Sequence, residues 1–433
     1  MSKTSASPRL VALQYRDFRL LWLGQLISIT GSQMQIVAVD WHIYELLKGQ
    51  IYLFSLLGWE IPLQAEALGL GALGLMRVLP IIVFALVGGV LADALDRRRL
   101  MMWTQGAAAV FAGLLALATF GGYDSVPVVY LLTAATAAAM AFDNPARQSL
   151  IPNLVPREHL SNAVSLNTLM WQIATIVGPA LAGVLVGWFN LSLVYLLNAL
   201  SFVAVLVALW LMRYRKQERV EISGLNWQAL VEGVRFTYRS RLIWSTMLLD
   251  FFATFFSSAR TMLPIVASDI LGVGVQGYGL LATAQPIGAV LAGSVLSLRR
   301  EIQRQGAVLL ISVVIYGLAT AFFGVSTVFA LSYLLFGLTG AADTVSTVIR
   351  GTLRQVMTPD HLRGRMIGVN MIFFMGGPQL GELEAGLVAA ALGVPFAIVS
   401  GGLATVLLTG WVAWKYPKLR HYTAATAAEI VRS

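Results

Sequence analysis

The segment IIVFALVGGVLADALDRRRLMMWTQGAAAVF covers residues 81–111 and places two apolar runs on either side of a short charged turn. The turn contains Asp93 and Asp96, followed by three arginines at 97–99. About 20 apolar residues cross a bilayer as a helix, whereas a charge at the bilayer centre costs about 2.5–3.5 kcal/mol. The segment therefore predicts two membrane-spanning helices joined by a turn that stays in water.

The composition of the whole chain also indicates a membrane protein. Of the 433 residues, 58% are hydrophobic and 12% are charged, whereas a soluble domain carries about 25% charged residues. This deficit excludes a soluble enzyme of two or three domains. Because the chain has no cysteine, disulfides, thiolate catalysis and cysteine-ligated metal are also excluded.

Twelve apolar runs are long enough to span the membrane, so we expect an all-α integral membrane fold of two pseudo-symmetric six-helix bundles. Residues 1–17 lack the pattern of a cleaved signal peptide, and the first span is expected to be retained. The predicted spans are 18–44, 70–92, 100–120, 127–146, 165–187, 191–212, 241–268, 277–298, 306–324, 328–348, 366–390 and 395–415.

The positive charges predict the orientation of these spans. Of the 30 Lys and Arg, 27 lie before the first span, after the last, or at every second connection, the exceptions being Lys48, Arg77 and Arg260. Positive charge is retained on the cytoplasmic side, so both termini are expected in the cytoplasm. The net charge of +9 is then a topological signal, and we expect no nucleic-acid partner.

An internal repeat relates the two halves. Arg147 matches Arg350 at an offset of 203, and Arg19 matches Arg241 at an offset of 222. The larger offset exceeds the smaller by 19 residues, which form an outer insert at about 48–68. Parallel halves of this kind place a substrate site between them, near the bilayer midplane. The predicted domains are a first half at 1–212, a cytoplasmic linker at 213–240, a second half at 241–415 and a cytoplasmic tail at 416–433.

Sequence motifs for nucleotide or metal binding are either absent or lack the structural context that they require. The pattern GxGxxG occurs at 69–74 and 272–277, but a dinucleotide site needs a preceding strand, and these glycines favour flexible entry into a helix. The dipeptide Gly-Lys and the motif HExxH are absent, and the four histidines are widely separated. We therefore expect no cofactor, no metal, no ATP-binding site on the chain and no enzyme activity.

The charged turn resembles the signature loop of the major facilitator superfamily, which joins helices 2 and 3 of a twelve-helix transporter. Ala94 stands where a basic residue is usual and Asp96 where a glycine is usual, which weakens the transfer of the loop's charge relay. The residues that match the signature are Gly89, Asp93, Arg97 and Arg98.

The resemblance implies a cytoplasmic latch. Asp93 would accept hydrogen bonds from the first amides of span 11, near Arg365, where the helix dipole favours a negative charge. The alternative is a solvated ion pair of Asp93 with Arg97 or Arg98.

Three further segments resemble one group of proteins within this superfamily. FRLLWLGQ at 18–25, GGVLAD at 88–93 and NPARQ at 144–148 are similar to the bacterial drug and siderophore exporter group, which includes the enterobactin exporters and the macrolide efflux proteins. The similarity covers about 15–420 and implies a group of exporters, not a substrate.

Two Gly-Pro pairs are candidate conformational breaks. Gly178-Pro179 in span 5 partly resembles a motif of superfamily antiporters, and Gly377-Pro378 in span 11 echoes it. A Gly-Pro pair loosens a helix and lets a neighbour approach closely. The alternative is ordinary tight packing.

Charges inside apolar spans are candidates for proton coupling, because an intramembrane charge is costly to retain. Asp40 and Arg260 are expected at similar depth, so we hypothesise an ion pair or shared proton site. The alternative is that Asp40 only pairs with Arg77 or Arg260 to hold the outer parts together. The proton-coupling candidates are Asp40, Arg260, Asp250, Glu382 and Glu384.

The remaining acidic candidates are less defined. No basic partner for Asp250 is evident in the sequence. Glu382 and Glu384 lie about 200° apart around a helix, so both cannot face one cavity.

The expected substrate cavity is mainly aromatic and apolar, although aromatic residues of such helices also face lipid or pack. The outer insert, with Trp59 and Pro62, is expected either as an amphipathic lid at the outer interface or as a poorly ordered loop. The cavity candidates are Gln25, Trp41, Tyr44, Trp171, Phe251, Phe255 and Phe373.

These features predict a monomeric secondary transporter in a bacterial cytoplasmic membrane. It would export an amphipathic small molecule, a siderophore or drug-like compound, by proton antiport through alternating access. The alternatives are an importer or uniporter of a small solute, or a non-transporting receptor or assembly factor on this fold. Intact Gly-Pro pairs and intramembrane carboxylates favour transport.

Overall fold

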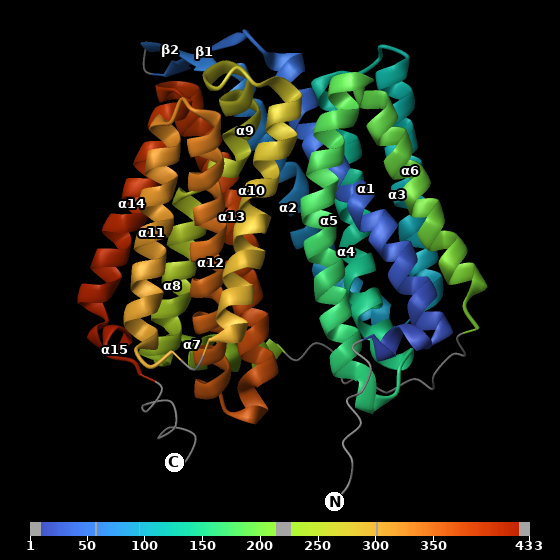
Figure 1. The fold of residues 1–433 in the computed structure, drawn as a ribbon, viewed down its shortest axis with the longest axis vertical. Coiled ribbons are helices and arrows are strands. Elements are labelled where there is room, and N and C mark those ends of the chain that lie inside the picture. The colour runs from blue at the N-terminus through green and yellow to red at the C-terminus, as the bar shows by residue number, and fades with distance from the viewer. Residues whose placement is uncertain (1–9, 57–58, 95, 214–226, 300–301, 424–433) are drawn as a thin grey trace, which may run out of the picture. The chain divides into compact units, whose positions relative to one another are not determined.

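The computed structural model describes residues 10–56, 59–94, 96–213, 227–299 and 302–423 (Figure 1). At 85–94, and at several positions between 360 and 375, it describes the backbone but not the side chains. The first half contains the long helices α1 (Arg16–Leu47), α2 (Ala65–Ala94), α3 (Arg97–Phe120), α4 (Val126–Leu150), α5 (Leu160–Trp188) and α6 (Leu191–Leu211).

The second half begins with the short helix α7 (Trp227–Arg239), which falls in the predicted linker. Short 3-10 turns occur at Val11–Gln14, Ile151–Asn153 and Arg157–His159. The other helices are α8 (Arg241–Phe256), α9 (Leu263–Ile265), α10 (Gly274–Leu298), α11 (Gln305–Val325), α12 (Phe329–Met357), α13 (Asp360–Leu392), α14 (Val394–Lys415) and α15 (Pro417–Arg420).

Each of the twelve predicted spans contains a helix, which confirms the all-α fold class. Within the described residues, ten helical segments are long and apolar enough to cross a membrane. Helices α1 and α13 are not among these ten, although they are the longest. Polar residues inside them, such as Gln33, Asp40 and His42 in α1, lower their hydropathy.

The seventh predicted span is not one continuous helix. Helix α8 ends at Phe256, and a 3-10 turn at Ala259–Met262, the short α9 and a π-helical turn at Val266–Ile270 follow. Two serines at 257–258 and Pro264 stand at these breaks, and Pro264 lacks the amide that a continuous helix would need.

The chain divides into two compact units, residues 1–42 with 76–224 and residues 43–75 with 225–433. The outer end of α1, the insert and the start of α2 therefore group with the second half. Local contacts explain this grouping, because the Tyr44 hydroxyl donates to Asp269 Oδ1 at 2.6 Å and lies 2.7 Å from the hydroxyl of Ser268.

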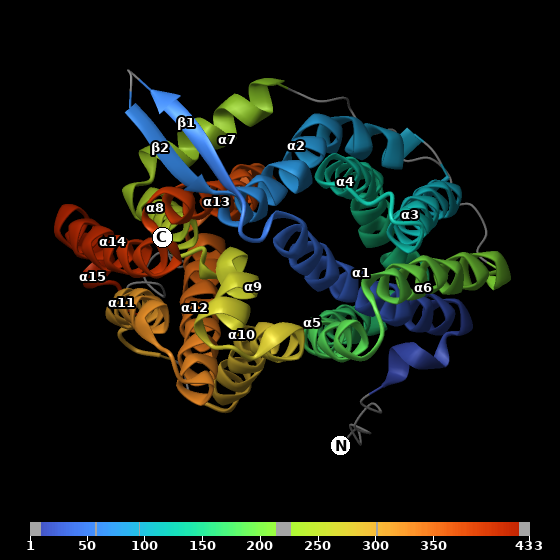
Figure 2. The ribbon, with the colours of Figure 1, turned by 90° about the horizontal axis from the view of Figure 1, so that it is seen from above.

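In the first unit, α3 packs between α4 and α6 (Figure 2). Helix α1 joins this group through the Trp22 indole, which donates to the carbonyl oxygen of Leu166 in α5 at 3.0 Å. The arginines after the charged turn add contacts at helix ends, because Arg97 donates to Ser149 O at 2.9 Å and Arg98 to Trp210 O at 3.0 Å. Cations at carbonyl-bearing helix ends are favoured by the helix dipole.

Asp96, which departs from the superfamily signature, has a local role. Its Oδ1 accepts a hydrogen bond from the Arg99 amide at 3.0 Å, so Asp96 is the N-cap of α3. A capping carboxylate satisfies one of the free amides at a helix start.

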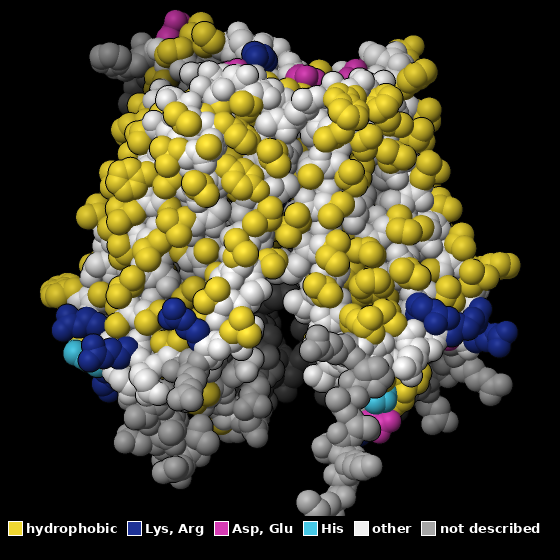
Figure 3. Space-filling view, in the orientation of Figure 1, with side chains coloured by type: hydrophobic (Ala, Val, Ile, Leu, Met, Phe, Trp, Pro, Cys, Tyr) yellow, Lys and Arg dark blue, Asp and Glu magenta, His cyan; other side chains and the backbone are white. Residues whose placement is uncertain are grey.

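In the second unit, α11 packs between α12 and α14, while α10 packs on α12 and α13 packs on α8. An apolar core of this unit includes Leu249, Leu309, Ile349 and Leu353. Apolar side chains cover the flanks of each unit, and Lys and Arg gather at one end of each (Figure 3). This distribution is the one that a lipid environment requires.

The outer insert is a β-hairpin. Strand β1 (Ile51–Leu56) pairs antiparallel with β2 (Trp59–Gln64), with Ile51 opposite Gln64 and Phe54 opposite Ile61. The expectation of a poorly ordered loop is therefore wrong for these strands. Aromatic and branched residues favour an extended, paired backbone.

The expectation of flexible helix entry holds for only one of the two glycine repeats. Gly272 and Gly274 have φ values of 63° and 61° in the turn before α10. Gly71, in contrast, lies inside α2, where a Cβ atom would stand 2.8 Å from the Cα of Gly386 in α13. The first repeat therefore allows two helices to pack closely.

We predict that Gly71→Ala destabilises the protein by about 1–3 kcal/mol, because overpacking a helix contact forces backbone shifts. Gly113→Ala in α3 is the control, since nothing lies within 4 Å of its added Cβ. This control should be neutral or stabilise by about 0.5–1 kcal/mol. Thermal unfolding in detergent measures both, and equal melting temperatures would contradict the close packing.

Candidate functional site

A buried polar cluster lies inside the first unit. The Arg147 guanidinium of α4 donates to Gln25 Oε1 of α1 at 3.1 Å and to Asn144 Oδ1. It also stands over the Trp171 ring of α5, 5.4 Å from the ring centroid. Gln25 and Arg147 are both buried, at 2% and 6% exposure. Three helices thus converge on one cation.

Asp143 extends this cluster one turn earlier on α4. Its Oδ1 accepts hydrogen bonds from Thr104 Oγ1 at 3.0 Å and from Gln105 Nε2 at 2.9 Å, both on α3. Buried charges persist only when they are paired and hydrogen-bonded. Asp143 lies close to the cation of Arg147 and provides its compensating charge.

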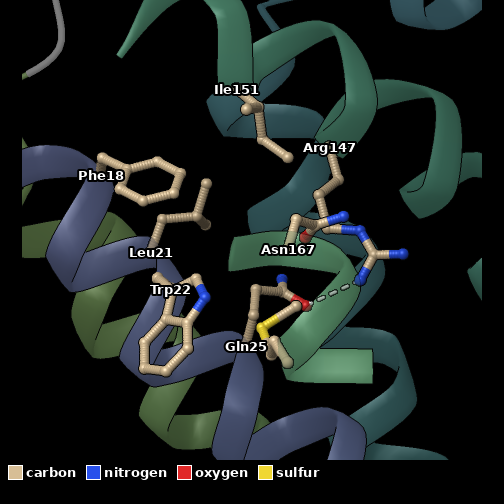
Figure 4. A pocket seen from close by; sticks show the side chains of 8 residues that line it. Phe18, Leu21, Trp22, Gln25, Arg147, Ile151 and Asn167 are labelled. Atoms are coloured by element: carbon tan, nitrogen blue, oxygen red, sulfur yellow. Dashed lines mark hydrogen bonds between the residues drawn. The ribbon is translucent and has the colours of Figure 1, made fainter. Parts of the chain in front are cut away.

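A narrow pocket of about 10 Å³, roughly the room for one water molecule, borders the cluster. Figure 4 shows Gln25 reaching toward Arg147 beside Trp22. The Gln25 Nε2 donor is buried and has no hydrogen-bond partner among the described residues. A buried, unsatisfied donor costs about 1–3 kcal/mol, so this pocket can accept an acceptor oxygen. Its lining residues are Phe18, Leu21, Trp22, Gln25, Arg147, Ile151, Asn167 and Met170.

The second unit has a matching cluster around Arg350, the repeat equivalent of Arg147. Arg350 pairs with Asp250 at 3.0 Å, and Arg354 pairs with the same carboxylate at 3.5 Å. Arg354 also donates to Thr246 Oγ1 at 3.1 Å and to Asn370 Oδ1. At the 222-residue offset of the first helices, Asp250 corresponds to Ser28, so the acidic partner lies on a different helix in each unit.

The expectation that Asp250 has no evident basic partner is therefore wrong. Its partners lie on α12, 100 and 104 residues further along the chain. No local pattern joins these positions, and only the packing of α8 on α12 brings them together.

At the outer end of the first unit, Asp40 of α1 forms an ion pair with Arg77 of α2. This is one of the two partners that the sequence left open, and the pairing with Arg260 stays a prediction. Arg260 itself lies in the 3-10 turn after α8 and is exposed.

His42 lies on α1, two residues after Asp40. It was not among the residues that the sequence marked as candidates. It is 2% exposed, and its ring nitrogens contact Tyr195 Oη at 3.0 Å and Asp124 Oδ2 at 2.8 Å. The partners belong to α6 and to the connection between α3 and α4. Only its position in an otherwise apolar span could have marked it.

In the second unit, Tyr44 and Lys48 converge on Asp269. The Lys48 ammonium stands 3.3 Å from Asp269 Oδ1 and 5.1 Å from the Tyr44 ring centroid. The hydrogen bond to Tyr44 raises the pKa of Lys48. The hydroxyl of Tyr44 is therefore occupied by hydrogen bonds within this cluster. Trp41, one turn earlier on α1, is also buried.

The aromatic cavity candidates of the second unit lie together. Phe251 stacks on Phe255 with ring centroids 5.5 Å apart, and it meets Phe373 of α13 edge to face at 6.2 Å. Trp244 continues the row beside Phe373 at 5.6 Å. These half-buried rings form an apolar wall on α8 and α13.

Both Gly-Pro glycines face the first helix of their own half. A Cβ on Gly178 of α5 would stand 2.9 Å from Thr30 O of α1, and a Cβ on Gly377 of α13 would meet Phe251 of α8 at 3.6 Å. Tight packing is thus present at both positions, and a conformational role stays a prediction.

The last candidates lie apart from these clusters. Glu382 of α13 faces Gly74 of α2, where a Cβ would stand 2.8 Å from the carboxylate, and Glu384 is half-buried. The side chains of Gly89, Asp93 and Arg365 lie outside the described part of the structure, so the latch stays a prediction. No group of three metal-binding side chains occurs among the described residues.

Comparison with known proteins relates the whole chain to membrane exporters. A family model described as transmembrane secretion effector matches residues 7–430. Enterobactin exporter EntS of Salmonella typhimurium is 28% identical over 404 residues, covering 91% of this chain and 92% of the relative. The Escherichia coli protein of the same name is 25% identical over 407 residues, covering 94% and 93%.

Solved structures share the fold at low identity. A bacterial homologue of the human lysosomal transporter Spinster matches with a TM-score of 0.71 and 14% identity, covering 95% of this chain and 99% of its own. A bacterial homologue of the iron transporter ferroportin matches with a TM-score of 0.66 and 19% identity, covering 92% and 98%. The expectation of a transporter rather than an enzyme is confirmed.

We predict that Asp250→Asn lowers the free energy of unfolding by about 3–5 kcal/mol, because it leaves Arg350 and Arg354 buried without their shared anion. Asp343→Asn is the matched control. Asp343 also contacts Arg350, at 3.5 Å, but its side chain is 48% exposed, so its loss should cost about 0–1 kcal/mol. Thermal unfolding in detergent separates the two, and equal destabilisation would contradict the assignment.

Proposed function

We propose that this chain, which belongs to the transmembrane secretion effector family of the major facilitator superfamily, exports an amphipathic small molecule from a bacterial cytoplasm. Siderophores are the first class to test, because enterobactin exporters match nearly the full length of the chain. The protein would work as a monomer in the cytoplasmic membrane, with both termini in the cytoplasm.

The observation that carries the proposal is the buried donor group of Gln25 and Arg147, which borders a narrow pocket. The unsatisfied Gln25 amide and the Arg147 guanidinium offer hydrogen bonds to acceptor oxygens, while Trp22 and Phe18 line the same pocket. An apolar pocket with a few convergent polar groups is typical of small-molecule sites. A cargo with planar apolar groups and exposed oxygens fits this chemistry.

Energy would come from protons entering in exchange for cargo. We assign the proton to Asp40, whose negative charge is balanced by Arg77. Protonation of Asp40 from outside would remove that charge and release Arg77, and deprotonation toward the cytoplasm would restore an ion pair of Asp40 with Arg77 or with Arg260. A membrane potential adds about 2.3 kcal/mol per charge for each 100 mV.

Alternating access would use contacts within each unit. Outward opening would separate residues 43–47 of α1 from Ser268 and Asp269, and closing would restore the Tyr44 and Lys48 contacts. On the cytoplasmic side, the latch of Asp93 would act in the opposite phase. The Gly-Pro pairs in α5 and α13 would let these helices bend against α1 and α8.

An importer, a uniporter and a receptor on the same fold are the competing functions. An importer coupled to protons would accumulate cargo under the opposite gradient. A uniporter would equilibrate cargo without any gradient, and a receptor would bind cargo without moving it.

We predict that inside-out vesicles with an acidic lumen take up enterobactin through this protein, because antiport moves cargo toward the acidic side. Uptake should stop when nigericin collapses the pH gradient. Asp40→Asn should lower gradient-driven uptake to the level of protein-free vesicles while leaving the protein folded. The measurements are labelled cargo and the lumenal pH, with a macrolide as a second cargo.

Two variants serve as controls for this experiment. Glu60→Gln, on the exposed hairpin, should transport normally. Arg77→Gln removes the ion pair but keeps the carboxylate, so it should retain some coupling. Undiminished coupling in Asp40→Asn would remove Asp40 from the mechanism, and equal misfolding of Asp40→Asn and Arg77→Gln would indicate a structural pair only.

We also predict that Gln25→Ala raises the KM for enterobactin by up to about tenfold, because one hydrogen bond contributes about 0.5–1.5 kcal/mol. Ser165→Ala is the control, since that exposed hydroxyl of α5 only donates to Ser161 O. An unchanged KM in Gln25→Ala would exclude the pocket as the cargo site.

A further inference from the structure

The outer hairpin has two chemically different faces. Directly opposed residues of an antiparallel pair share a face, and the register pairs Tyr52 with Leu63 and Phe54 with Ile61. These four residues, which we term the apolar hairpin face, include no charged or amide side chain. The other face contains all the described polar side chains of the two strands, namely Ser55, Glu60 and Gln64.

The apolar hairpin face is open. Tyr52 is 47% exposed, Phe54 is 51% exposed and Ile61 is 36% exposed. Soluble proteins rarely leave several large apolar side chains uncovered side by side, and such patches mark contact surfaces. The opposite face is also partly apolar, because Ile51 is 63% exposed and Leu53, which pairs with Pro62, is 67% exposed. It differs from the apolar hairpin face in that Ser55, Glu60 and Gln64 also lie on it.

The position of the hairpin limits what can cover it. It connects the outer end of α1 to the start of α2, and β2 packs on α13 of the same unit. Figures 1 and 2 both show the two strands at this end of the second unit. The hairpin therefore lies at the ends of the apolar helices α1 and α2, where we expect the bilayer interface.

A second copy of the chain is a poor occupant. A stable protein interface uses about 20–30 residues on each side, and the apolar hairpin face offers four. The bilayer interface, in contrast, favours tyrosine and other aromatic residues at the headgroup level. It also tolerates a strand edge, because unpaired backbone groups meet water there, whereas the hydrocarbon core would not satisfy them.

We propose that the apolar hairpin face binds the outer leaflet of the membrane, with Tyr52 and Phe54 at the boundary between headgroups and acyl chains. Ser55, Glu60 and Gln64 then face water. The contact would hold residues 43–75, which link the two units through α1 and α2, at a set depth in the bilayer. This membrane anchor is independent of cargo and proton chemistry.

The absence of native cysteine permits a direct test. Single-cysteine variants Tyr52→Cys, Phe54→Cys and Ile61→Cys probe the apolar hairpin face, and Leu53→Cys and Ser55→Cys are matched controls on the same strand. Each is labelled with an environment-sensitive fluorophore and placed in nanodiscs, one copy per disc. Quenching is measured with iodide in water and with lipids that carry a nitroxide near the headgroup.

We expect quenching to alternate along β1. Labels at 52, 54 and 61 should be quenched by the nitroxide lipid and protected from iodide, and labels at 53 and 55 should show the reverse. Iodide quenching that is equal at all five positions would overturn the proposal. Protection at 52 and 54 without lipid quenching would also overturn it, because protein would then cover the face. Protection that requires two copies per disc would assign the face to a second chain.

Folding is checked by the melting temperature of each labelled variant. A variant that melts like the unsubstituted protein reports the native hairpin, and a label at Leu63→Cys, on the same face, replaces any that does not. Because the readout is accessibility and not transport, failure of the anchor leaves the proposed export function standing, and failure of export leaves the anchor standing.

Discussion

A guanidinium surrounded by apolar helices needs a compensating anion and hydrogen-bond acceptors, and each unit of this protein builds a polar cluster around one repeat-related arginine. Arg147 is held by Gln25, Asn144 and the ring of Trp171, with Asp143 nearby. Arg350 pairs with Asp250, which a second arginine also contacts. Because insertion of a bare charge is so costly, these clusters determine which helices lie against one another.

The two clusters differ in a way that separates their roles. In the second unit the carboxylate of Asp250 pairs with two cations and holds α8 against α12, although Arg350 Nε has no hydrogen-bond partner among the described residues. In the first unit Gln25 keeps an unsatisfied donor beside a pocket. The same structural position in the repeat has therefore become a structural contact in one half and a candidate binding site in the other.

Helices α1 and α2 connect these two environments. Polar residues follow α1 from Gln25 at one end to Asp40 near the other, and the last turn, with Tyr44, packs in the second unit. The close approach of Gly71 to α13 attaches α2 in the same way. Residues of α1 and of α2 therefore belong to both units.

The sequence by itself predicted the spans, the repeat, the superfamily and the outer insert. Membrane insertion depends on local hydropathy, and the repeat consists of matching residues at fixed offsets in the chain. It also marked Asp40 and Gln25, since a polar residue in an apolar run is visible without partners. Only the tertiary structure decided that Asp250 pairs with Arg350, that His42 contacts Asp124, and that the insert is a hairpin with one apolar face. Those outcomes depend on contacts between residues tens to hundreds of positions apart, and helix packing, not local sequence, brings such residues together.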